Sequence, residues 1–223
     1  MSAYPQLQKH KIIPDVLPEG VDLPSELVVK WPNANLDTPG DQLDRQGTQT
    51  EPTVYVKPPA PDKYDDYVLI MTDPDLMSTN DTKFGQVRHW LAGKISIKED
   101  GQLVIPTAGN VSHYIGPAPL PNPKRPHRYV FILCRARTTN LAPITIDKAD
   151  LRATQSDYPA AFEGRQEVQD LKDRWGFNAY KFMEMKGLVP VAATFMLVGG
   201  NLKSAAENLG MTAKAGVDKI LKI

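Results

Sequence analysis

Two short segments of the chain carry side chains that can bind an anion or move a proton, and each adjoins a predicted strand. In the first segment, the apolar run 67–71 leads into Asp73, Pro74 and Asp75, and His89 follows after a polar loop. Because proline fixes its own φ and disfavours the helical region for the residue before it, Asp73 is expected at an extended strand end. His89 opens the next predicted strand, so it can return to the same edge of the sheet.

The second segment is a proline-rich loop, residues 114–126, that leads into His127 and Tyr129. These two residues are separated by one position, so their side chains point to the same face of a strand. A carboxylate beside a histidine favours the charged imidazolium, and imidazole and phenol groups donate directional hydrogen bonds to phosphate or carboxylate oxygens. Together the segments predict a small anion-binding pocket where Asp73, His89, His127 and Tyr129 converge.

Each feature also has a competing interpretation. Asp-Pro-Asp by itself is usually a turn, and a single histidine at a strand end is more often structural. An enzyme is a second possibility, in which Asp73 and His89 activate water or a substrate hydroxyl. No credible nucleophile supports an enzyme, since Ser78 is expected in a turn without a base and Cys134 in the core. A scaffold with a vestigial pocket is a third interpretation.

The composition narrows the class of protein. The 223 residues include 26 Lys and Arg and 26 Asp and Glu, and this balance gives no electrostatic reason to expect a nucleic-acid partner. Cys134 is the only cysteine, which fits a reducing compartment. The sequence has neither a transmembrane apolar run nor a signal peptide, so a cytoplasmic location is expected. No His-x-His or cysteine cluster indicates a metal site, and no cofactor is expected.

The elements that must position these residues are mainly strands. Strands are expected at 26–31, 53–56, 67–71, 89–97, 103–105, 128–137 and 188–198. In the strand 128–137, side chains 130, 132 and 134 face one way and side chains 129, 131 and 133 the other. Helical structure is expected at 4–11, 160–175 and 214–221. Prolines exclude a regular helix at 12–24, and residues 33–51 are expected to form a loop.

Strands outnumber helices and are joined by irregular loops. This favours a mainly β fold, a sandwich of two antiparallel sheets with a few peripheral α-helices. No repeat or linker divides the chain, so residues 1–223 are expected to form a single domain. Within it, residues 1–25 are expected to form an N-terminal arm and residues 201–223 a C-terminal helical tail.

The two segments resemble the two signature regions of the phosphatidylethanolamine-binding protein family. Asp73 to Ser78 resembles its D-P-D-x-P-S element, with Met77 in place of the proline, and Gly116 to Phe131 resembles its G-x-x-P-P…H-R-Y-V-F element. The resemblance covers about residues 67–133 and continues more weakly at 188–195. It implies a two-sheet sandwich and a binding protein without enzymatic activity. The arm and the Gly-Pro-Ala-Pro loop look most like the fungal carboxypeptidase Y inhibitor branch.

The resemblance also implies which residues bind the ligand and what the ligand is. The residues that match the family's pocket are Asp73, Asp75, His89, Ala118, Pro119, His127 and Tyr129. The implied ligands are phospholipid head groups, other phosphorylated or anionic small molecules, and acidic groups of partner proteins. The family includes serine carboxypeptidase inhibitors and kinase regulators, so a modulator of a serine carboxypeptidase or of a kinase pathway is the expected role.

Three further family features bear on the pocket. A cis peptide bond without proline precedes the family's first pocket histidine, and the matching bond here is Gly85–Gln86. The loop 121–126 differs from the family pattern before His127. The tail from Lys203 onward has no tyrosine to match the one that covers the pocket in animal members. The pocket mouth is therefore expected to differ from that of the animal proteins.

Overall fold

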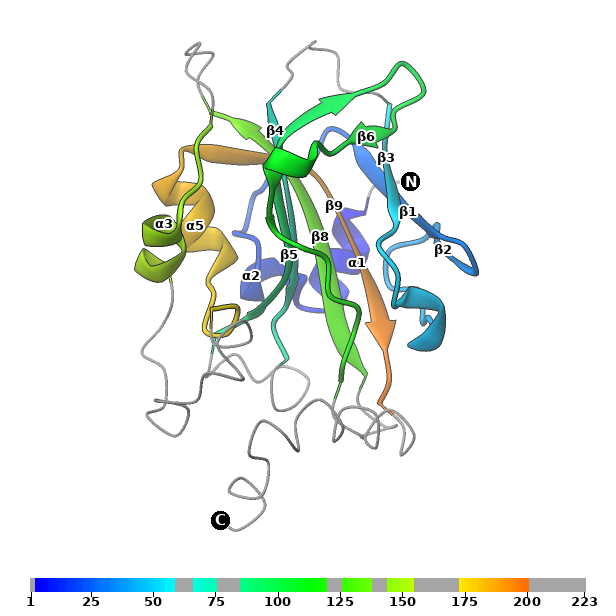
Figure 1. Ribbon diagram of the computed structural model, residues 1–223. Helices are drawn as coiled ribbons and strands as arrows, with labels where there is room; N and C mark the ends of the chain where they lie inside the picture. Colours follow the sequence, from blue (N-terminus) through cyan, green and yellow to red (C-terminus); the bar gives the residue numbers. More distant parts are fainter. Residues whose placement is uncertain are drawn as a thin grey trace, which may run out of the picture.

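In the computed structural model, a large antiparallel sheet forms the centre of the molecule and a smaller sheet packs against one of its faces (Figure 1). The structure describes residues 3–58, 66–75, 85–119, 126–137, 144–154 and 173–200. The large sheet contains β4 (Tyr67–Asp73), β5 (Val87–Ile97), β6 (Leu103–Val104), β7 (Asn110–Ser112), β8 (His127–Ala136) and β9 (Leu188–Val198). Its strand order is β6-β5-β4-β8-β9, and β7 also pairs with β5. The small sheet has the order β2-β1-β3, from β1 (Glu26–Trp31), β2 (Ala34–Leu36) and β3 (Thr53–Lys57).

The central strands β4 and β8 are buried on both faces because the large sheet is covered on both sides. All residues of β4 are buried, as are the first eight of β8. One face packs on the small sheet in a cluster that includes Trp31, Val56 and Phe131. The other face packs on helices in a cluster that includes Leu7 and Phe182. Burial on both faces explains why the strand 67–71 is continuously apolar.

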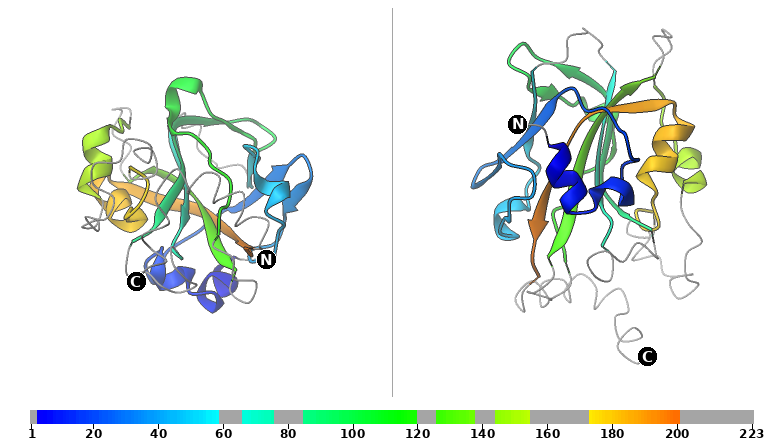
Figure 2. Two further views of the ribbon diagram at one scale, coloured as in Figure 1. Left: turned by 60° about the horizontal axis from the view of Figure 1, so that its bottom comes forward. Right: turned by 180° about the vertical axis from the view of Figure 1, so that it is seen from behind.

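Short helices cover the face of the large sheet that points away from the small sheet (Figure 2). The N-terminal arm forms α1 (Tyr4–Lys9) and α2 (Ile12–Asp15). On the same face, α3 (Lys148–Ala153) and α5 (Ala179–Met185) lie next to each other, and Lys186 Nζ bonds Asp150 Oδ2 at 3.0 Å (Figure 1). Within the described ranges, no helix is long and apolar enough to cross a membrane.

The predicted fold class is confirmed: the protein is a mainly β sandwich of two antiparallel sheets with a few helices. β1 and β9 have the predicted bounds, 26–31 and 188–198. The predicted alternation along β8 is also confirmed, since side chains 130, 132 and 134 join the helix-facing cluster and side chains 129, 131 and 133 the other. Apolar runs in the sequence therefore predicted the long, buried strands.

Several shorter elements differ from the prediction. The loop expected at 33–51 is wrong in part, because it contains β2 and a 3-10 helix, η1 (Gln46–Thr48). The helical structure expected at 4–11 ends at Lys9, and the range 12–24 contains only the short α2, in which Ile13 has non-helical angles. α3 and α5 were not predicted. Elements of three to seven residues are stabilised mainly by tertiary contacts. They are also too short for the hydrophobic periodicity of the sequence to predict them.

Other expectations concern the backbone and the ends of the chain. The expected cis bond at Gly85–Gln86 is wrong, since the cis bonds of the described residues precede Pro14 and Pro58. Of the helix expected at 160–175, only residues 173–175 are described, and these form a turn. The tail 201–223, with its expected helix at 214–221, lies outside the described residues, as does the loop 121–125.

A test of the fold is provided by Gly101, which lies in the turn between β5 and β6 and joins the two sheets. Its φ is +86°, its carbonyl accepts a hydrogen bond from Val56 N at 2.9 Å, and a Cβ there would lie 2.3 Å from Val56 O. Gly101→Ala should cost about 2–3 kcal/mol of unfolding free energy through backbone strain and the clash. The melting temperature should fall by roughly 4–12 °C. Gly199→Ala is the control, because nothing lies within 4 Å of its added Cβ; equal melting temperatures would contradict the prediction.

Candidate functional site

The predicted site residues lie at one end of the large sheet, where β4 ends and its two neighbours begin. Asp73 is the last residue of β4, His127 is the first residue of β8, and His89 lies near the start of β5. β4 pairs antiparallel with both β5 and β8, so its end lies between their starts. The side chains of Asp73, His89, His127 and Tyr129 are all buried, with at most 5% of each residue exposed.

Asp73 and His127 form a buried ion pair. Oδ2 of Asp73 accepts a hydrogen bond from His127 Nδ1 at 2.9 Å, and Oδ1 accepts from the backbone N–H of Asp75 at 2.7 Å. Burial alone would raise the pKa of Asp73, but the charge of His127 and its hydrogen bond outweigh burial and hold that pKa below its ordinary value. Burial alone would lower the pKa of His127, but Asp73 outweighs it and raises that pKa. The imidazolium is thus favoured, with its Nε2–H left as a charged donor.

His89 has a different environment on the same end of the sheet. Its Nδ1 donates to the carbonyl oxygen of Ile115 at 2.8 Å, and Ile115 N donates back to His89 O at 3.0 Å. Because a carbonyl only accepts, the proton of the neutral ring is on Nδ1 and Nε2 is an acceptor. Burial lowers the pKa of His89 by more than the charge of Asp73 raises it. His89 therefore becomes a donor through Nε2 only when the ring takes up a proton.

Tyr129 connects the two histidines and the loop. Its ring meets the His89 ring edge-on at 5.1 Å and lies nearly parallel to the His127 ring at 6.4 Å, measured between centroids. The hydroxyl accepts a hydrogen bond from Ala118 N at 3.2 Å and also bonds Asp73, and burial together with Asp73 raises the pKa of the phenol. The sequence suggested that this phenol is a donor to the ligand, but its hydrogen bonds are made within the protein, so the geometry favours a positioning role.

The loop before residue 120 is held from a second direction by the segment that contains η1. Arg45 Nε and Gln49 Nε2 donate to Pro117 O at 3.1 and 3.0 Å. A Cβ on Gly116 would lie 2.8 Å from the Cα of Gln49, so only glycine allows this close approach. Pro119, which follows Ala118 in the chain, is also buried. The backbone that presents Ala118 to the site is therefore fixed.

Asp75 is engaged by Arg128 instead of facing the histidines. Its Oδ1 accepts from Arg128 Nη2 at 2.7 Å, and its Oδ2 accepts from Nε and from the backbone N–H of Arg128, both at 2.9 Å. Nη1 of Arg128 donates to Asp15 Oδ2 and to His10 O, both at 2.8 Å. Asp75 and Arg128 are at most 1% exposed. We therefore assign Asp75 a positioning role, in which it joins the end of β4 to the start of β8 and, through Arg128, to the arm.

Sequence reasoning did not select three arginines that shape the site. Arg128 could have been found, because it stands directly between His127 and Tyr129 in the chain. Arg45 and Arg174 could not, since each reaches the site only through folding. Arg174 Nη1 donates to His89 O at 3.0 Å.

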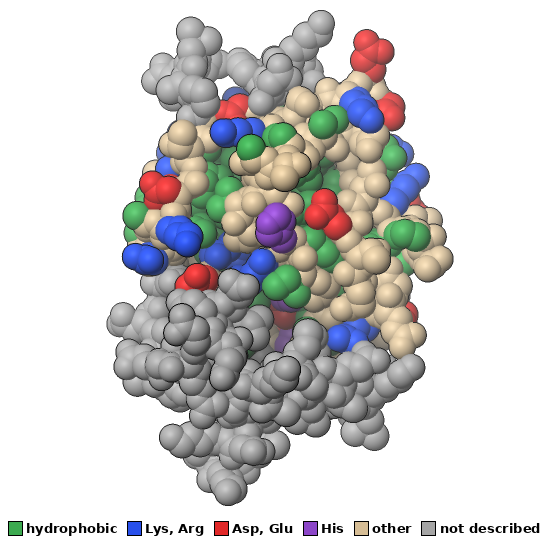
Figure 3. All heavy atoms as spheres, in the orientation of Figure 1, with side chains coloured by type: hydrophobic (Ala, Val, Ile, Leu, Met, Phe, Trp, Pro, Cys, Tyr) green, Lys and Arg blue, Asp and Glu red, His purple; other side chains and the backbone are tan. Residues whose placement is uncertain are grey.

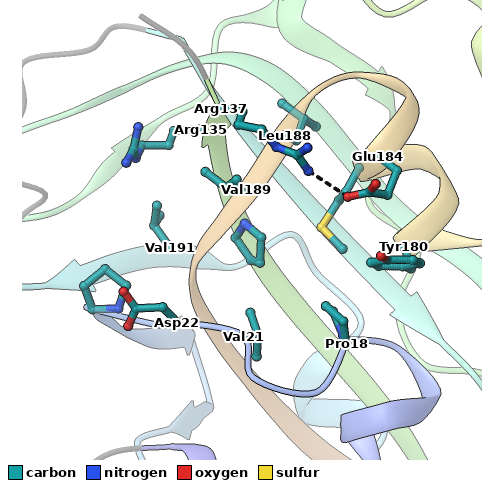
Figure 4. Close-up of a pocket in the computed structure, with 13 residues that line it drawn as sticks. Pro18, Val21, Asp22, Arg135, Arg137, Tyr180, Glu184, Leu188, Val189 and Val191 are labelled. Carbon is teal, nitrogen blue, oxygen red and sulfur yellow. Dashed lines mark hydrogen bonds and ion pairs between the residues drawn. The ribbon is translucent and has the colours of Figure 1, made fainter.

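A separate hollow of about 390 Å³ lies at the other end of the sheet (Figure 4). Its walls come from the stretch 18–24, α5, the end of β8 and the start of β9, and the exposed ion pair Arg137–Glu184 spans 2.7 Å beside Tyr180. None of the predicted site residues lines it.

Acidic, basic and hydrophobic side chains are interspersed on the face drawn in Figure 3, so charge does not single out a docking surface there.

Comparison with known proteins agrees with the fold. The family model described as phosphatidylethanolamine-binding protein matches residues 32–180, which include all the predicted site residues. The uncharacterised protein YLR179C of Saccharomyces cerevisiae is 32% identical over 140 residues, which are 58% of this chain and 68% of that protein.

Two solved structures are similar in fold. A carboxypeptidase Y inhibitor complexed with the cognate proteinase has a TM-score of 0.62 at 21% identity, over 89% of this chain and 95% of the inhibitor. The phosphatidylethanolamine-binding protein from Plasmodium vivax has a TM-score of 0.59 at 23% identity, over 88% of this chain and 97% of that protein.

The pairing of Asp75 with Arg128 predicts a large loss of stability on mutation. Asp75→Asn removes the main counter-charge of a guanidinium that is 1% exposed and should cost about 3–5 kcal/mol of unfolding free energy. Glu184→Gln is the matched control, because its pair with Arg137 has the same 2.7 Å separation but side chains that are 48% and 53% exposed. The control should lose less than about 1 kcal/mol. Urea unfolding measures both, and similar small losses would contradict the assigned role.

Proposed function

We propose that this chain, which belongs to the phosphatidylethanolamine-binding protein family, is a binding protein without enzymatic activity whose histidine cluster holds an anion. The observation that carries the proposal is the buried ion pair of Asp73 and His127 at 2.9 Å. It favours an imidazolium in a site largely removed from water, where the attraction between opposite charges is far stronger than in bulk solvent. The expected ligand group is a phosphoryl group or a carboxylate, from a phosphorylated head group or from a partner protein.

The same geometry favours binding over catalysis. A general base must be free to accept a proton, but the raised pKa of His127 favours its charged form and Asp73 is hydrogen-bonded to it. The hydroxyl of Tyr129 is hydrogen-bonded within the protein. The thiol of Cys134 is buried with a raised pKa, 3.5 Å from the sulfur of Met183. Neutral His89 keeps Nε2 as an acceptor, but no nucleophile that is ready to react lies in the described part of the cluster for it to activate.

Proton uptake is expected to accompany binding of a dianion. Asp73 and His127 cancel in charge, and Asp75 lies against Arg128, so the centre of the site has little net charge of its own. A dianion between the histidines favours the charged form of His89 and raises its pKa. The affinity for a dianion should therefore fall as the pH rises through the lowered pKa of free His89, and again through the raised pKa of His127.

We infer a serine carboxypeptidase as the protein partner, with a component of a kinase pathway as the second candidate. The support is the similarity in fold, over 89% of this chain, to a carboxypeptidase Y inhibitor that was solved with its cognate proteinase. In this view an acidic side chain or a terminal carboxylate of the enzyme occupies the anion site.

Sulfate, a dianion across the useful pH range, tests the anion site by calorimetric titration at about pH 5.5 and about pH 8, on either side of the ordinary histidine pKa. At about pH 5.5, His127→Gln should weaken sulfate by about ten- to a hundredfold, because a charged hydrogen bond is worth roughly 1.5–3 kcal/mol. Asp73→Asn keeps the donor but lowers the pKa of His127. Its defect should therefore be large at about pH 8 and small at about pH 5.5.

His113→Gln is the control for this titration, because His113 is an exposed histidine outside the cluster. It should bind sulfate as the wild type does. O-phosphorylethanolamine, measured in parallel, tests whether a phosphorylated head group uses the same residues. If the wild type binds neither compound at either pH, the cluster is not an anion site.

Inhibition of peptide hydrolysis by carboxypeptidase Y tests the proposed partner. The wild-type chain should inhibit the enzyme, and His127→Gln should inhibit about tenfold less well, as expected for loss of a buried charged contact at an interface. Persistent full activity of the enzyme in a large excess of this chain would exclude that partner. The sulfate titration would still decide the anion site independently.

A further inference from the structure

Residues 173–177 lie against the start of β5, directly beside the site. Gln86 N donates to Phe177 O at 2.8 Å, Phe177 N donates back to Gln86 O at 2.9 Å, and Arg88 N donates to Arg174 O at 2.8 Å. These are backbone contacts between segments that are more than 80 positions apart in the chain. The backbone of Arg174 is therefore fixed next to the strand that carries His89.

The guanidinium of Arg174 contacts the backbone of His89 itself. Nη1 donates to His89 O at 3.0 Å, with a longer contact to Arg88 O at 3.4 Å. The same His89 carbonyl accepts from Ile115 N at 3.0 Å. One carbonyl thus joins β5, the loop that contains Ile115, and the segment that carries Arg174.

Arg88 has a different role from Arg174. Its Nε donates to Ser112 Oγ at 2.9 Å, its Nη2 donates to Asp173 O at 2.6 Å, and its guanidinium lies 5.3 Å from the centre of the Phe177 ring. Arg88 therefore anchors the segment 173–177, whereas Arg174 brings a cation to the backbone carbonyl of His89 and close enough to act on the charge of its ring.

We propose that Arg174 is a positioning residue of the anion site, which holds the backbone of His89 and supplies a positive charge that favours dianions over monoanions. The inference rests on the anion site proposed above and assigns it a selectivity that the sequence motifs do not contain. The charged groups that face His89 are Asp73 from β4, His127 from β8 and Arg174 from the segment 173–177.

Coulomb's law gives the proposal a quantitative form. Arg174 disfavours a proton on His89, which contributes to the lowered pKa of that ring after burial. Loss of Arg174 raises the pKa of His89, and above that pKa the extra proton on His89 would partly replace the lost charge. Below the pKa of His89 the ring is already charged, so the loss of Arg174 weakens the ligand without this replacement. The interaction energy is proportional to the ligand charge, so the factor by which a dianion is weakened should be about the square of the factor for a monoanion.

The test uses two ligands whose charge does not change with pH, sulfate as the dianion and dimethyl phosphate as the monoanion. NMR titration of the imidazole resonances first gives the pKa of His89 in each variant without ligand. Calorimetry below that pKa then gives the affinities. Arg174→Gln should raise the pKa of His89, weaken dimethyl phosphate by about two- to threefold, and weaken sulfate by about four- to tenfold.

Matched variants separate charge from structure. Arg174→Lys keeps a cation and a donor, so it should retain the pKa of His89 and the preference for sulfate. Arg174→Met repeats the neutral substitution with an apolar side chain if the glutamine variant does not fold. Arg137→Gln removes an exposed guanidinium at the far end of β8 and should behave as the wild type.

Three results would overturn the role of Arg174: an unchanged pKa of His89 in the neutral variants, equal weakening of both ligands, or a loss in Arg174→Lys as large as in Arg174→Gln. A wild-type chain that binds neither ligand would instead overturn the proposed function. In that case the pKa of His89 in the neutral variants would still show whether the charge of Arg174 acts on this ring.

Discussion

The buried guanidinium of Arg128 is the constraint on which the rest of the site depends. A charge that is 1% exposed cannot be hydrated, so protein groups must satisfy it, and they come from the end of β4, from α2 and from the backbone of His10. Removing one such partner costs several kcal/mol, which makes any other placement of these segments unfavourable. His127 directly precedes Arg128, and the backbone N–H of Arg128 donates to Asp75 Oδ2, so the same anchoring places the backbone of His127 near the end of β4.

The two histidines lie at the same end of the sheet, but the carboxylate of Asp73 makes their pKa values differ. Burial opposes the charged form of both rings, but only His127 bonds Asp73 directly, whereas His89 donates to a neutral carbonyl. The pKa values consequently move in opposite directions from the ordinary histidine value. The site thereby combines one imidazole whose charged form the protein favours with another whose charged form it disfavours.

The sequence predicted the elements and residue types of the site better than their connections. Long apolar runs predicted the strands β4, β8 and β9. The motifs around Asp73 and His127 indicated that β4, β5 and β8 meet at the site. They did not indicate that Asp73 bonds His127 in place of His89, or that the carboxylate of Asp75 is taken up by Arg128. The partners of Asp73 and Asp75 depend on distances between neighbouring strands. Arg174 and His89, which are also in contact, lie 85 positions apart in the sequence. Periodicity and spacing carry no information about such contacts.

The charge balance of the proposed site leads to a distinction between its two classes of ligand. A carboxylate from a partner protein carries one negative charge and can accept a hydrogen bond from Nε2–H of His127 while His89 stays neutral. A dianion such as sulfate carries a second charge, which is attracted to the proposed charge of Arg174 and also favours a proton on His89, although burial and Arg174 both lower the pKa of that ring. Acidification should therefore favour a ligand that stays a dianion over a carboxylate, because the dianion gains more from the additional proton on His89. Under the proposed function, the cluster would discriminate between ligands by their charge, and the protonation of His89 would set the preference.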